Sequence, residues 1–361
     1  MNRFISIIDR YIIRKFLGTY VFSIMLIISI SVVFDLNEQL DKFIKNDAKT
    51  SAIIFDYYLN FIPYYANLFS SLFVFIAVIF FTSKLADNSE FIAMLSTGMS
   101  FKRLMKPYMI SATIIAVFTF ILSGFIIPPA NVVRIDFQNK YIKNKKKDYD
   151  ERIQMQIEPG VIGYISRYYD DDKKGHDFSL DKFNGKELVS RLTAAQIEYD
   201  SGHHWILHNY SIREFEGMRE HISSGARIDT ILAITPRDFL ISVNDFEQMT
   251  TPELYDYINR QKDRKIGGIQ GFEIEFHKRV AAFASAFILT IIGASLSSRK
   301  VKGGMGLNIG IGLAISASYI LFMTVSSSFA VSGIVSPFVA AWIPNIIFAI
   351  IAAYLYTKAP N

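Results

Sequence analysis

Three histidines are the side chains in this sequence with the clearest potential to bind a metal ion. His203, His204 and His208 stand close together, and on a β-strand His204 and His208 would share a face. A zinc site needs three or four nitrogen, sulfur or carboxylate ligands. The chain has no cysteine, no carboxylate set stands beside these histidines, and Trp205 lies between them. We therefore predict no metal site.

Motifs for covalent or nucleotide chemistry are absent as well. The sequence contains no GxSxG, no HExxH and no GxxxxGK[ST] motif. The glycines of GGMGLNIGIG (303–312) open an apolar run, where they are typical of helix-packing surfaces. We expect no catalytic residue and no cofactor in this chain, so that any ATP and Mg²⁺ would be bound by a partner.

The segment ADNSEFIAMLSTGMS (86–100) lies between two long apolar runs. Asp87 and Glu90 have the spacing of a capping box, an apolar stripe follows, and Gly98 can end a helix of about 88–97. One interpretation is a connector helix packed on the membrane or on its own spans. The other is a docking helix for a cytoplasmic, ATP-driven partner. The docking candidates are Asp87, Glu90, Phe91, Met94, Leu95 and Gly98.

Four basic residues at the edges of apolar runs are candidates for substrate contact. Lys42 and Lys45 follow the first run, and Lys278 and Arg279 open the fourth. Flanking basic residues commonly meet lipid headgroups. Because Lys and Arg are also the usual partners of phosphate, the same residues could hold an anionic substrate.

The composition indicates that a membrane bundle positions these residues. Of 361 residues, 51% are hydrophobic and 14% are aromatic. A span needs about 20 apolar residues. The sequence predicts six spans, three before and three after a large insertion, at about 16–34, 57–82, 107–128, 277–298, 305–327 and 335–356.

Basic residues predict the orientation of these spans. They gather before the first span, between the second and third, after the fourth and at the tail; they include Arg3, Arg10, Arg14, Lys15, Lys84, Lys102, Arg103, Lys106, Arg299, Lys300, Lys302 and Lys358. By the positive-inside rule both termini are cytoplasmic and the insertion is outside. The run KNKKK (143–147) does not contradict this, because long translocated domains are largely exempt. Such residues orient the chain, and we expect no nucleic-acid partner.

The insertion has the pattern of β structure. GVIGYISRYY, ELVSRLTAAQIEYD and HHWILHNYSIREFEG show partial apolar alternation broken by Gly, Asp and Asn. This predicts an all-β sandwich or jelly roll. TTPELYDYINRQKDR (250–264) predicts a short helix that leads back to the membrane. The expected domains are a first membrane half (1–133), the β insertion (134–270) and a second membrane half (271–361).

The ordered set of segments resembles the lipopolysaccharide-export permease family, LptF/LptG. The likeness is carried by EFIAMLSTGMS, by RLTAAQIEYDSGHHWILHNYSIREFEG, by MTTPELYDYI with EIEFHKRVAAFASAFILTIIGASLSSR, and by VSPFVAAWIPNIIFAIIAAYLY. It covers essentially the whole chain. One departure is Asp35, which stands where family members often have a basic residue at the outer end of span one.

The resemblance implies a permease subunit of an ABC exporter in the inner membrane of a Gram-negative bacterium. Two such subunits would form a cavity, take lipopolysaccharide from the outer leaflet and pass it through the periplasmic jelly roll to a bridge of similar domains. A cytoplasmic ATPase dimer would dock on the helix at 88–97, where the family's glutamate matches Glu90. Spans one and five would be the lateral gate.

Three other classes of protein remain as alternatives. A permease for lipoproteins or other lipids usually has four spans. A lipid-modifying membrane enzyme needs a cluster of acid, base or metal ligands. A secondary transporter favours charged residues within its spans, and these spans have almost none. An ATPase that co-purifies with the chain would count against the last two.

Overall fold

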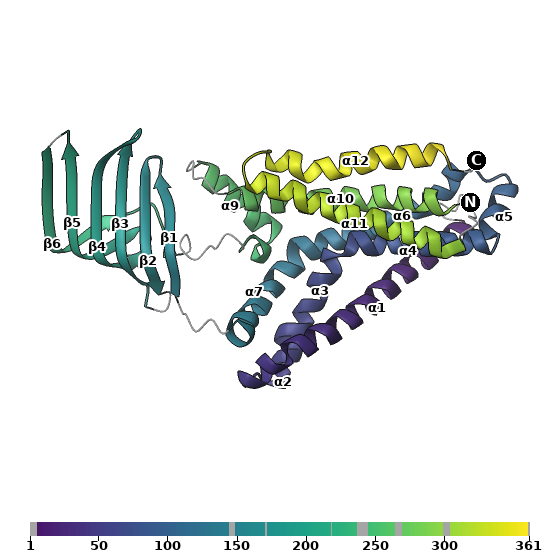
Figure 1. The fold of residues 1–361 in the computed structure, drawn as a ribbon, viewed down its shortest axis with the longest axis horizontal. Coiled ribbons are helices and arrows are strands. Elements are labelled where there is room, and N and C mark those ends of the chain that lie inside the picture. The colour runs from purple at the N-terminus through teal and green to yellow at the C-terminus, as the bar shows by residue number, and fades with distance from the viewer. Residues whose placement is uncertain are drawn as a thin grey trace. The chain divides into compact units, whose positions relative to one another are not determined.

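The structure is a computed structural model that describes residues 6–143, 149–169, 172–217, 219–236, 245–263, 269–298 and 304–359. The chain divides into two compact units. The helical unit is Met1–Asn144, Glu247–Thr251 and Gln270–Asn361, and the sheet unit is Lys145–Phe246 and Pro252–Ile269 (Figure 1). Arg3, Arg299, Lys300, Lys302 and most of the run 143–147, which entered the orientation prediction, lie outside the described residues.

The first half of the helical unit extends from α1 to the end of α7. It contains α1 (Ile7–Lys45), α2 (Thr50–Ala52), α3 (Leu59–Leu68), α4 (Ser70–Asp87), α5 (Glu90–Ser96), α6 (Phe101–Ile121) and α7 (Ile127–Phe137). Three π-helical stretches, Ile53–Tyr58, Leu122–Ile126 and Gln138–Ile142, lie between or after these helices. The second half contains α10 (Gln270–Ser297), α11 (Gly304–Val331) and α12 (Pro337–Thr357).

The prediction of six membrane spans is confirmed. Six helical segments of the described chain are long and apolar enough to cross a membrane: Ile7–Lys45, Ser70–Asp87, Phe101–Ile142, Gln270–Ser297, Gly306–Val331 and Pro337–Thr357. Three precede the sheet and three follow it. Two of these segments, Ile7–Lys45 and Phe101–Ile142, run well beyond the apolar stretches that predicted them.

The second span differs from the expected single helix. The chain leaves helical geometry at Phe69, where φ is −97° and ψ is 11°, so that α3 and α4 are separate helices. The C-terminal half of α1 joins the π-helical stretch Ile53–Tyr58, α3 and α7 around an aromatic cluster that includes Phe43, Tyr57, Phe61 and Phe137. These segments diverge from the main bundle (Figure 1).

The centre of the bundle is formed by α4 and α10. In their apolar windows 67% and 56% of the residues are buried, against 17% in α1 and 22% in α11. Gly293 of α10 permits this approach, because a Cβ atom there would lie 2.9 Å from the Val78 side chain of α4. In the run 303–312, Gly312 packs closely against α4, whereas a Cβ atom at Gly306 or Gly310 would meet no atom within 4 Å. The helix-packing prediction for this run thus holds for Gly312.

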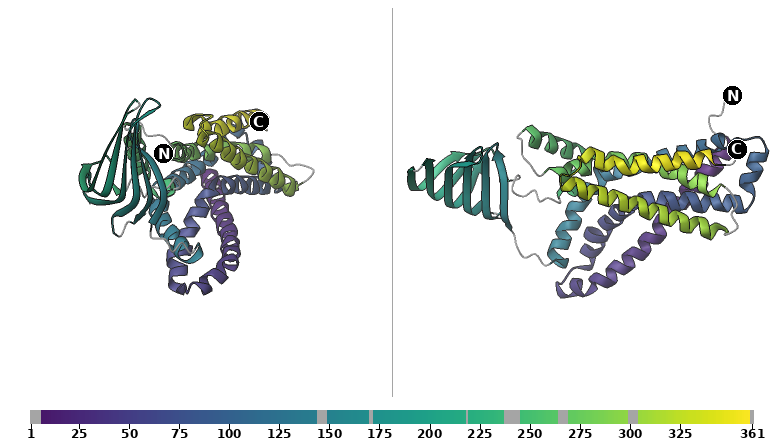
Figure 2. Two further views of the ribbon diagram at one scale, coloured as in Figure 1. Left: turned by 60° about the vertical axis from the view of Figure 1, so that its left-hand side comes forward. Right: turned by 45° about the horizontal axis from the view of Figure 1, so that its top comes forward.

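The insertion is all-β, as predicted. Its strands are β1 (Tyr149–Glu158), β2 (Val161–Tyr169), β3 (Lys174–Asn184), β4 (Glu187–Ser201), β5 (His204–Glu216) and β6 (Arg219–Ile231). They form one antiparallel sheet in which each strand pairs with the next, a simpler connection than the Greek keys of a jelly roll. The sheet is strongly curved (Figure 2). In the same unit, α9 (Thr251–Asp263) confirms the helix predicted after the strands.

The alternation of apolar residues slips by one position along a row that crosses the sheet. Buried residues that are normally two apart become three apart: Ile165 and Tyr168 in β2, and Ala194 and Ile197 in β4. Asp177 and Asn209 lie in this row with φ of 52° and 50°, values that Asp and Asn tolerate better than most residues. The pairing register is unchanged across this row, so neighbouring strands share the slip. The slip explains why the sequence shows only partial alternation.

One face of the sheet is therefore apolar on both sides of the row, and we call it the apolar face. Its buried residues are Ile157, Ile165, Tyr168, Phe178, Leu180, Ala194, Ile197, Trp205 and Leu207. Towards β6 the same face is half-buried, at Leu192, Tyr210, Ile212 and Ile228. Trp205 is fully buried and donates its Nε1–H to the carbonyl of Ile234 at 3.0 Å.

Candidate functional sites of the helical unit

The docking candidate α5 is a short helix at the end of the helical unit that holds both chain termini (Figure 1). The predicted capping box is not present. Asp87 is the last residue of α4, and Ser89, which precedes α5 with φ of 61°, makes no capping hydrogen bond with its side chain. The C-terminal prediction holds, because Gly98 follows the helix with φ of 85°. The left-handed turn at Ser89 aims α5 away from α4.

The apolar stripe of α5 faces its own bundle. Phe91 is 1% exposed, and its ring lies 6.3 Å from that of Phe101. Met94 and Leu95 are half-buried against the same cluster. These three residues hold the helix in place, as the connector interpretation expected, and Phe91 presents no surface to a partner in this conformation.

The outward face of α5 has a different composition. Ile92 is 53% exposed, and Ala93, Ser96 and Thr97 are also exposed. These four uncharged residues were not among the docking candidates. Their exposure could have been expected from their phase relative to Phe91, because the most apolar side of a surface helix normally faces its own core.

Glu90 connects α5 to the beginning of α1. Its carboxylate accepts a hydrogen bond from the Tyr11 hydroxyl at 2.9 Å and another from the Asn88 side-chain amide at 3.1 Å. Glu90 is half-buried and Tyr11 is 39% exposed. The carboxylate is therefore positioned by its own chain and remains accessible from outside.

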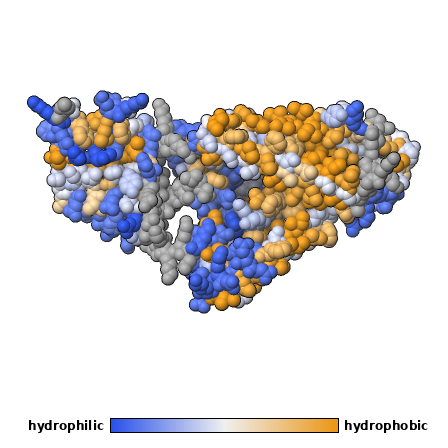
Figure 3. Space-filling view, in the orientation of Figure 1, coloured by the Kyte–Doolittle hydropathy of each residue, from blue (hydrophilic) through white to orange (hydrophobic). Residues whose placement is uncertain are grey.

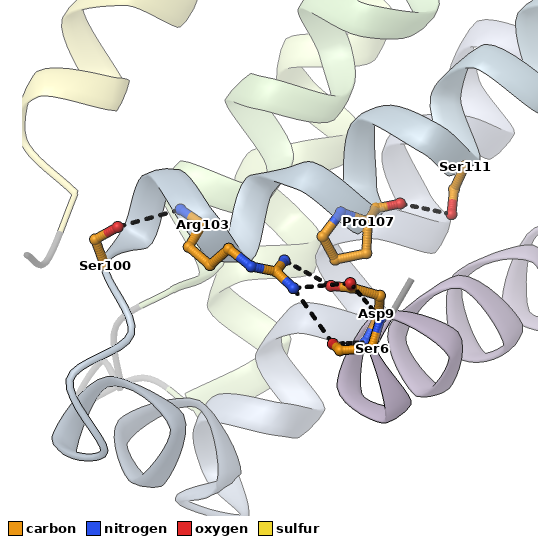
Figure 4. A network of polar contacts seen from close by, with 6 residues as sticks. All are labelled: Ser6, Asp9, Ser100, Arg103, Pro107 and Ser111. Atoms are coloured by element: carbon orange, nitrogen blue, oxygen red, sulfur yellow. Dashed lines mark hydrogen bonds and ion pairs between the residues drawn. The ribbon is translucent and has the colours of Figure 1, made fainter. Parts of the chain in front are cut away.

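A stronger link lies beside it, between Asp9 of α1 and Arg103 of α6 (Figure 4). Arg103 donates two parallel hydrogen bonds to the Asp9 carboxylate, at 2.7 and 2.8 Å, and a third to the Ser6 hydroxyl at 3.3 Å. Ser6 and Asp9 also form a capping box that begins α1. Sequence reasoning used Arg103 only for orientation; the Ser6–Asp9 spacing was the signal that marked this helix start.

The basic residues predicted for substrate contact have different environments. Lys42 and Lys45 are exposed in the last turn of α1, where Lys42 donates a hydrogen bond to Gln39 at 2.8 Å. Lys278 is half-buried. Among the described residues, no hydrogen bond or ion pair joins Lys42 or Lys45 of α1 to Lys278 of α10.

Arg279 has a structural environment in place of the expected substrate contact. It is 4% exposed. Its guanidinium donates to Glu275 at 3.0 Å, to the Met249 carbonyl at 3.0 Å and to the Thr251 hydroxyl at 3.1 Å. Because the guanidinium is buried and bound within the chain, it does not present a phosphate site in this conformation.

Arg279 holds one end of a strip, residues 247–251, that we call the return segment because it carries the chain from the sheet back to the helices. Its other end is held by the first half of the helical unit. The Tyr64 hydroxyl donates to the Glu247 carboxylate at 3.2 Å, and the Asn131 amide donates to the Glu247 carbonyl at 3.1 Å. Arg134, 5% exposed, lies over the Tyr64 ring at 4.1 Å. Burial raises the pKa of the Glu247 carboxyl, and the negative charge of Glu275 adds to the effect.

The histidines of the sheet unit do not converge. His208 contacts Glu198 at 3.2 Å, and His203 lies 3.5 Å from the carbonyl of Ile234. Within the ranges given above, no three His, Asp or Glu side chains come together in a way that could hold a metal ion.

Comparison with known proteins identifies the family. Residues 10–358 match the family model described as "Lipopolysaccharide export system permease LptF/LptG". No curated protein matches the chain. Six apolar helices arranged three and three around a sheet insertion agree with this fold. Because the match spans nearly the whole sequence, the chain belongs to the LptF/LptG family of lipopolysaccharide-export permeases.

Proposed function

We propose that this chain is one of two permease subunits of an ATP-driven exporter that extracts lipopolysaccharide from the inner membrane and passes it to its own sheet unit. Family membership supports the transport of lipopolysaccharide by a multi-pass protein of the inner membrane. The observation that carries the finer proposal is the apolar surface of α1 and α11, the two membrane helices with the smallest buried share.

The energetics of the substrate demand such a surface. A buried acyl chain gains about 0.8 kcal/mol for each methylene group, so a chain of roughly twelve carbons resists extraction by about 10 kcal/mol. Water is therefore no route for a glycolipid with several acyl chains. Extraction needs continuous apolar contact and an external source of work.

The helices supply the first part of this contact. The exposed apolar residues of α1 and α11 include Phe22, Met25, Leu26, Ile30, Phe34, Leu321, Phe322, Val325 and Phe329. Apolar residues also gather over α11 and α12 (Figure 3). A second family subunit that faces α1 and α11 would enclose a cavity, with these two helices as its lateral gate. Lys42 and Lys45, exposed at the last turn of α1, remain candidates for contact with the substrate's phosphates or with lipid headgroups.

The sheet supplies the next part. Its apolar face is half-buried at Leu192, Tyr210 and Ile212, so acyl chains could lie against it. A periplasmic bridge protein with a similar β domain would receive the substrate from there. In the orientation that we propose from the basic residues, both termini and α5 are cytoplasmic and the sheet unit is periplasmic.

A separate ATPase dimer, which binds ATP and Mg²⁺, would supply the work through α5. The exposed side chains of Ile92, Ala93 and Ser96 offer a contact surface, and Glu90 beside them can accept hydrogen bonds from a basic partner residue. Phe91 and Met94 anchor this surface to the bundle. A force on α5 therefore acts on the helices themselves.

Replacement of Glu90 by alanine tests this proposal. A hydrogen bond to a charged group contributes roughly 1.5–3 kcal/mol, so the Glu90→Ala variant should bind the ATPase about 10- to 100-fold more weakly and lose export to a similar extent. Binding is measured by co-purification and titration of the ATPase in detergent. The matched control is Glu38→Ala, which replaces an exposed glutamate of α1, far from α5 in the sequence. Normal ATPase binding by the Glu90 variant would place the docking surface elsewhere.

A further inference from the structure

We propose that the Asp9–Arg103 ion pair is the joint through which α1 follows the docked ATPase, and that the Tyr11–Glu90 hydrogen bond is given up when docking occurs. This inference rests on the proposed docking at α5. It adds two positioning residues, Asp9 and Arg103, and a partner exchange at Glu90.

Arg103 lies in the first turn of α6, shortly after the end of α5 in the sequence. After Gly98, the hydroxyl of Ser100 accepts a hydrogen bond from the backbone N–H of Arg103 at 3.3 Å and caps α6. The side chain of Arg103 then meets Asp9 with two parallel hydrogen bonds. A paired guanidinium and carboxylate fix orientation as well as distance. A displacement of α5 therefore reaches the first turn of α1 across few covalent and polar connections.

The burial of Asp9 makes this contact persistent. Asp9 is 1% exposed, and the neighbouring residues Ile12 and Phe16 belong to the same buried core. A carboxylate in such surroundings is costly without its partner. Arg103 is 39% exposed, but its donors are directed to Asp9 and Ser6 (Figure 4). The ion pair is therefore expected to survive motions that break weaker contacts.

The Tyr11–Glu90 contact has the opposite character. It is one hydrogen bond from a neutral phenol to a carboxylate, with both side chains partly exposed. A basic group of a partner would make a stronger, charge-assisted hydrogen bond to the same carboxylate. Glu90 would then leave Tyr11, while Arg103 would keep its hydrogen bonds to Asp9 and Ser6 at the beginning of α1.

The weak packing of α1 gives this joint its importance. In its apolar window only 17% of residues are buried, compared with 67% in α4. The first turns of α1 are packed better, because Ile12 and Phe16 are buried in the same core as Phe91 of α5 and Phe101 of α6. The ion pair adds a directional polar link to this packed part of α1, so that a displacement of α5 reaches the rest of the helix from its first turns.

The experiment compares ATP hydrolysis with lipopolysaccharide export in the reconstituted complex. Asp9→Asn should bind the ATPase normally and hydrolyse ATP within about twofold of wild type, while export per ATP falls roughly tenfold, because a neutral amide loses the charge-assisted pair. Asp181→Asn is the matched control, because Asp181 forms a similar paired contact with Arg191 in the sheet unit. The double exchange Asp9→Arg with Arg103→Asp should restore part of the coupling. Unchanged export per ATP in Asp9→Asn would overturn the inference.

A second measurement separates uncoupling from misfolding. Because the chain has no cysteine, spin labels at Ile7→Cys and Lys102→Cys are unique, and both positions are exposed. The distribution of distances between the two labels should stay narrow with and without a trapped nucleotide, and should broaden in Asp9→Asn. A narrow distribution in that variant would also contradict the inference. If Glu90→Ala binds the ATPase normally while Asp9→Asn broadens the distance, the docking proposal fails and the ion-pair joint stands.

The exchange at Glu90 has its own readout. Tyr11→Phe removes the competing hydroxyl and retains the ring, so ATPase affinity should rise by about two- to tenfold, the range expected for one hydrogen bond to a carboxylate that is partly exposed. Lower affinity in Tyr11→Phe would show that Tyr11 holds Glu90 ready for the partner, and the exchange would be wrong.

Discussion

A photoreactive residue at Ile212 is expected to capture lipopolysaccharide during export, and the same residue at Ser211 is not. Ile212 lies half-buried on the apolar face of the sheet, opposite Leu192 of β4. Ser211, the residue before it, lies on the other face, because side chains alternate along a strand. If acyl chains travel along the apolar face, the yields should differ at least about tenfold, since the two faces alternate with a period of two residues.

A second pair of positions makes the result independent of one residue. Leu192 and Thr193 of β4 are the register partners of Ile212 and Ser211. Leu192 should crosslink and Thr193 should not. The measurement is the mass shift of the full-length chain, in cells that export lipopolysaccharide and in cells depleted of the ATPase. Equal labelling at all four positions would mean that the lipid does not use this face.

The largest loss of stability is expected for Arg279→Leu. Removal of one member of a buried ion pair costs about 3–5 kcal/mol, because the other charge is left without its partner. The Glu275 side chain is 23% exposed, so we expect the lower end of this range, about 3 kcal/mol. Here the carboxylate of Glu275 and the carbonyl of Met249 would both lose their donor. We expect a lower yield of folded protein in detergent and earlier aggregation on heating.

Lys278→Leu is the control for this variant, because Lys278 is the neighbouring residue on α10 and is only half-buried. It should change stability by much less. A normal melting curve for Arg279→Leu, together with reduced labelling by a lipopolysaccharide photoprobe, would instead favour the substrate-contact interpretation. The two outcomes cannot be confused, because one concerns the fold and the other the ligand.

The spans were predictable because an apolar run reports directly on the membrane environment. The break at Phe69 was not, since no glycine or proline stands there and Pro63 lies inside α3. The β character of the insertion was also predictable. The pairing order of its strands was not predictable, because alternation indicates a strand without naming its neighbours, and the alternation itself is interrupted at the row through Asp177 and Asn209.

In the candidate sites, too, local features were predictable from the sequence and tertiary contacts were not. The position of α5 followed from a local pattern, but which of its faces packs on the bundle did not: Phe91 and Met94 face the bundle, and Ile92 faces outward. Asp9 and Arg103 are separated by 94 residues, so their pairing depends on the tertiary fold. The same holds for Arg279, whose contacts with Met249 and Thr251 turn an apparent phosphate ligand into a structural residue.

The return segment marks a place in the sequence where the sheet could be exchanged without disturbing the helical unit. Residues 247–251 follow the sheet in sequence but belong to the helical unit, where Tyr64 and Asn131 of one half and Arg279 of the other hold them. A Cβ atom at Gly124 would lie 2.9 Å from the Thr251 hydroxyl, so the return segment also packs closely against the π-helical stretch Leu122–Ile126. A chimaera that exchanges the sheet upstream of Glu247 would leave these contacts intact, so members of the family could differ in their sheets without a change in the helical unit.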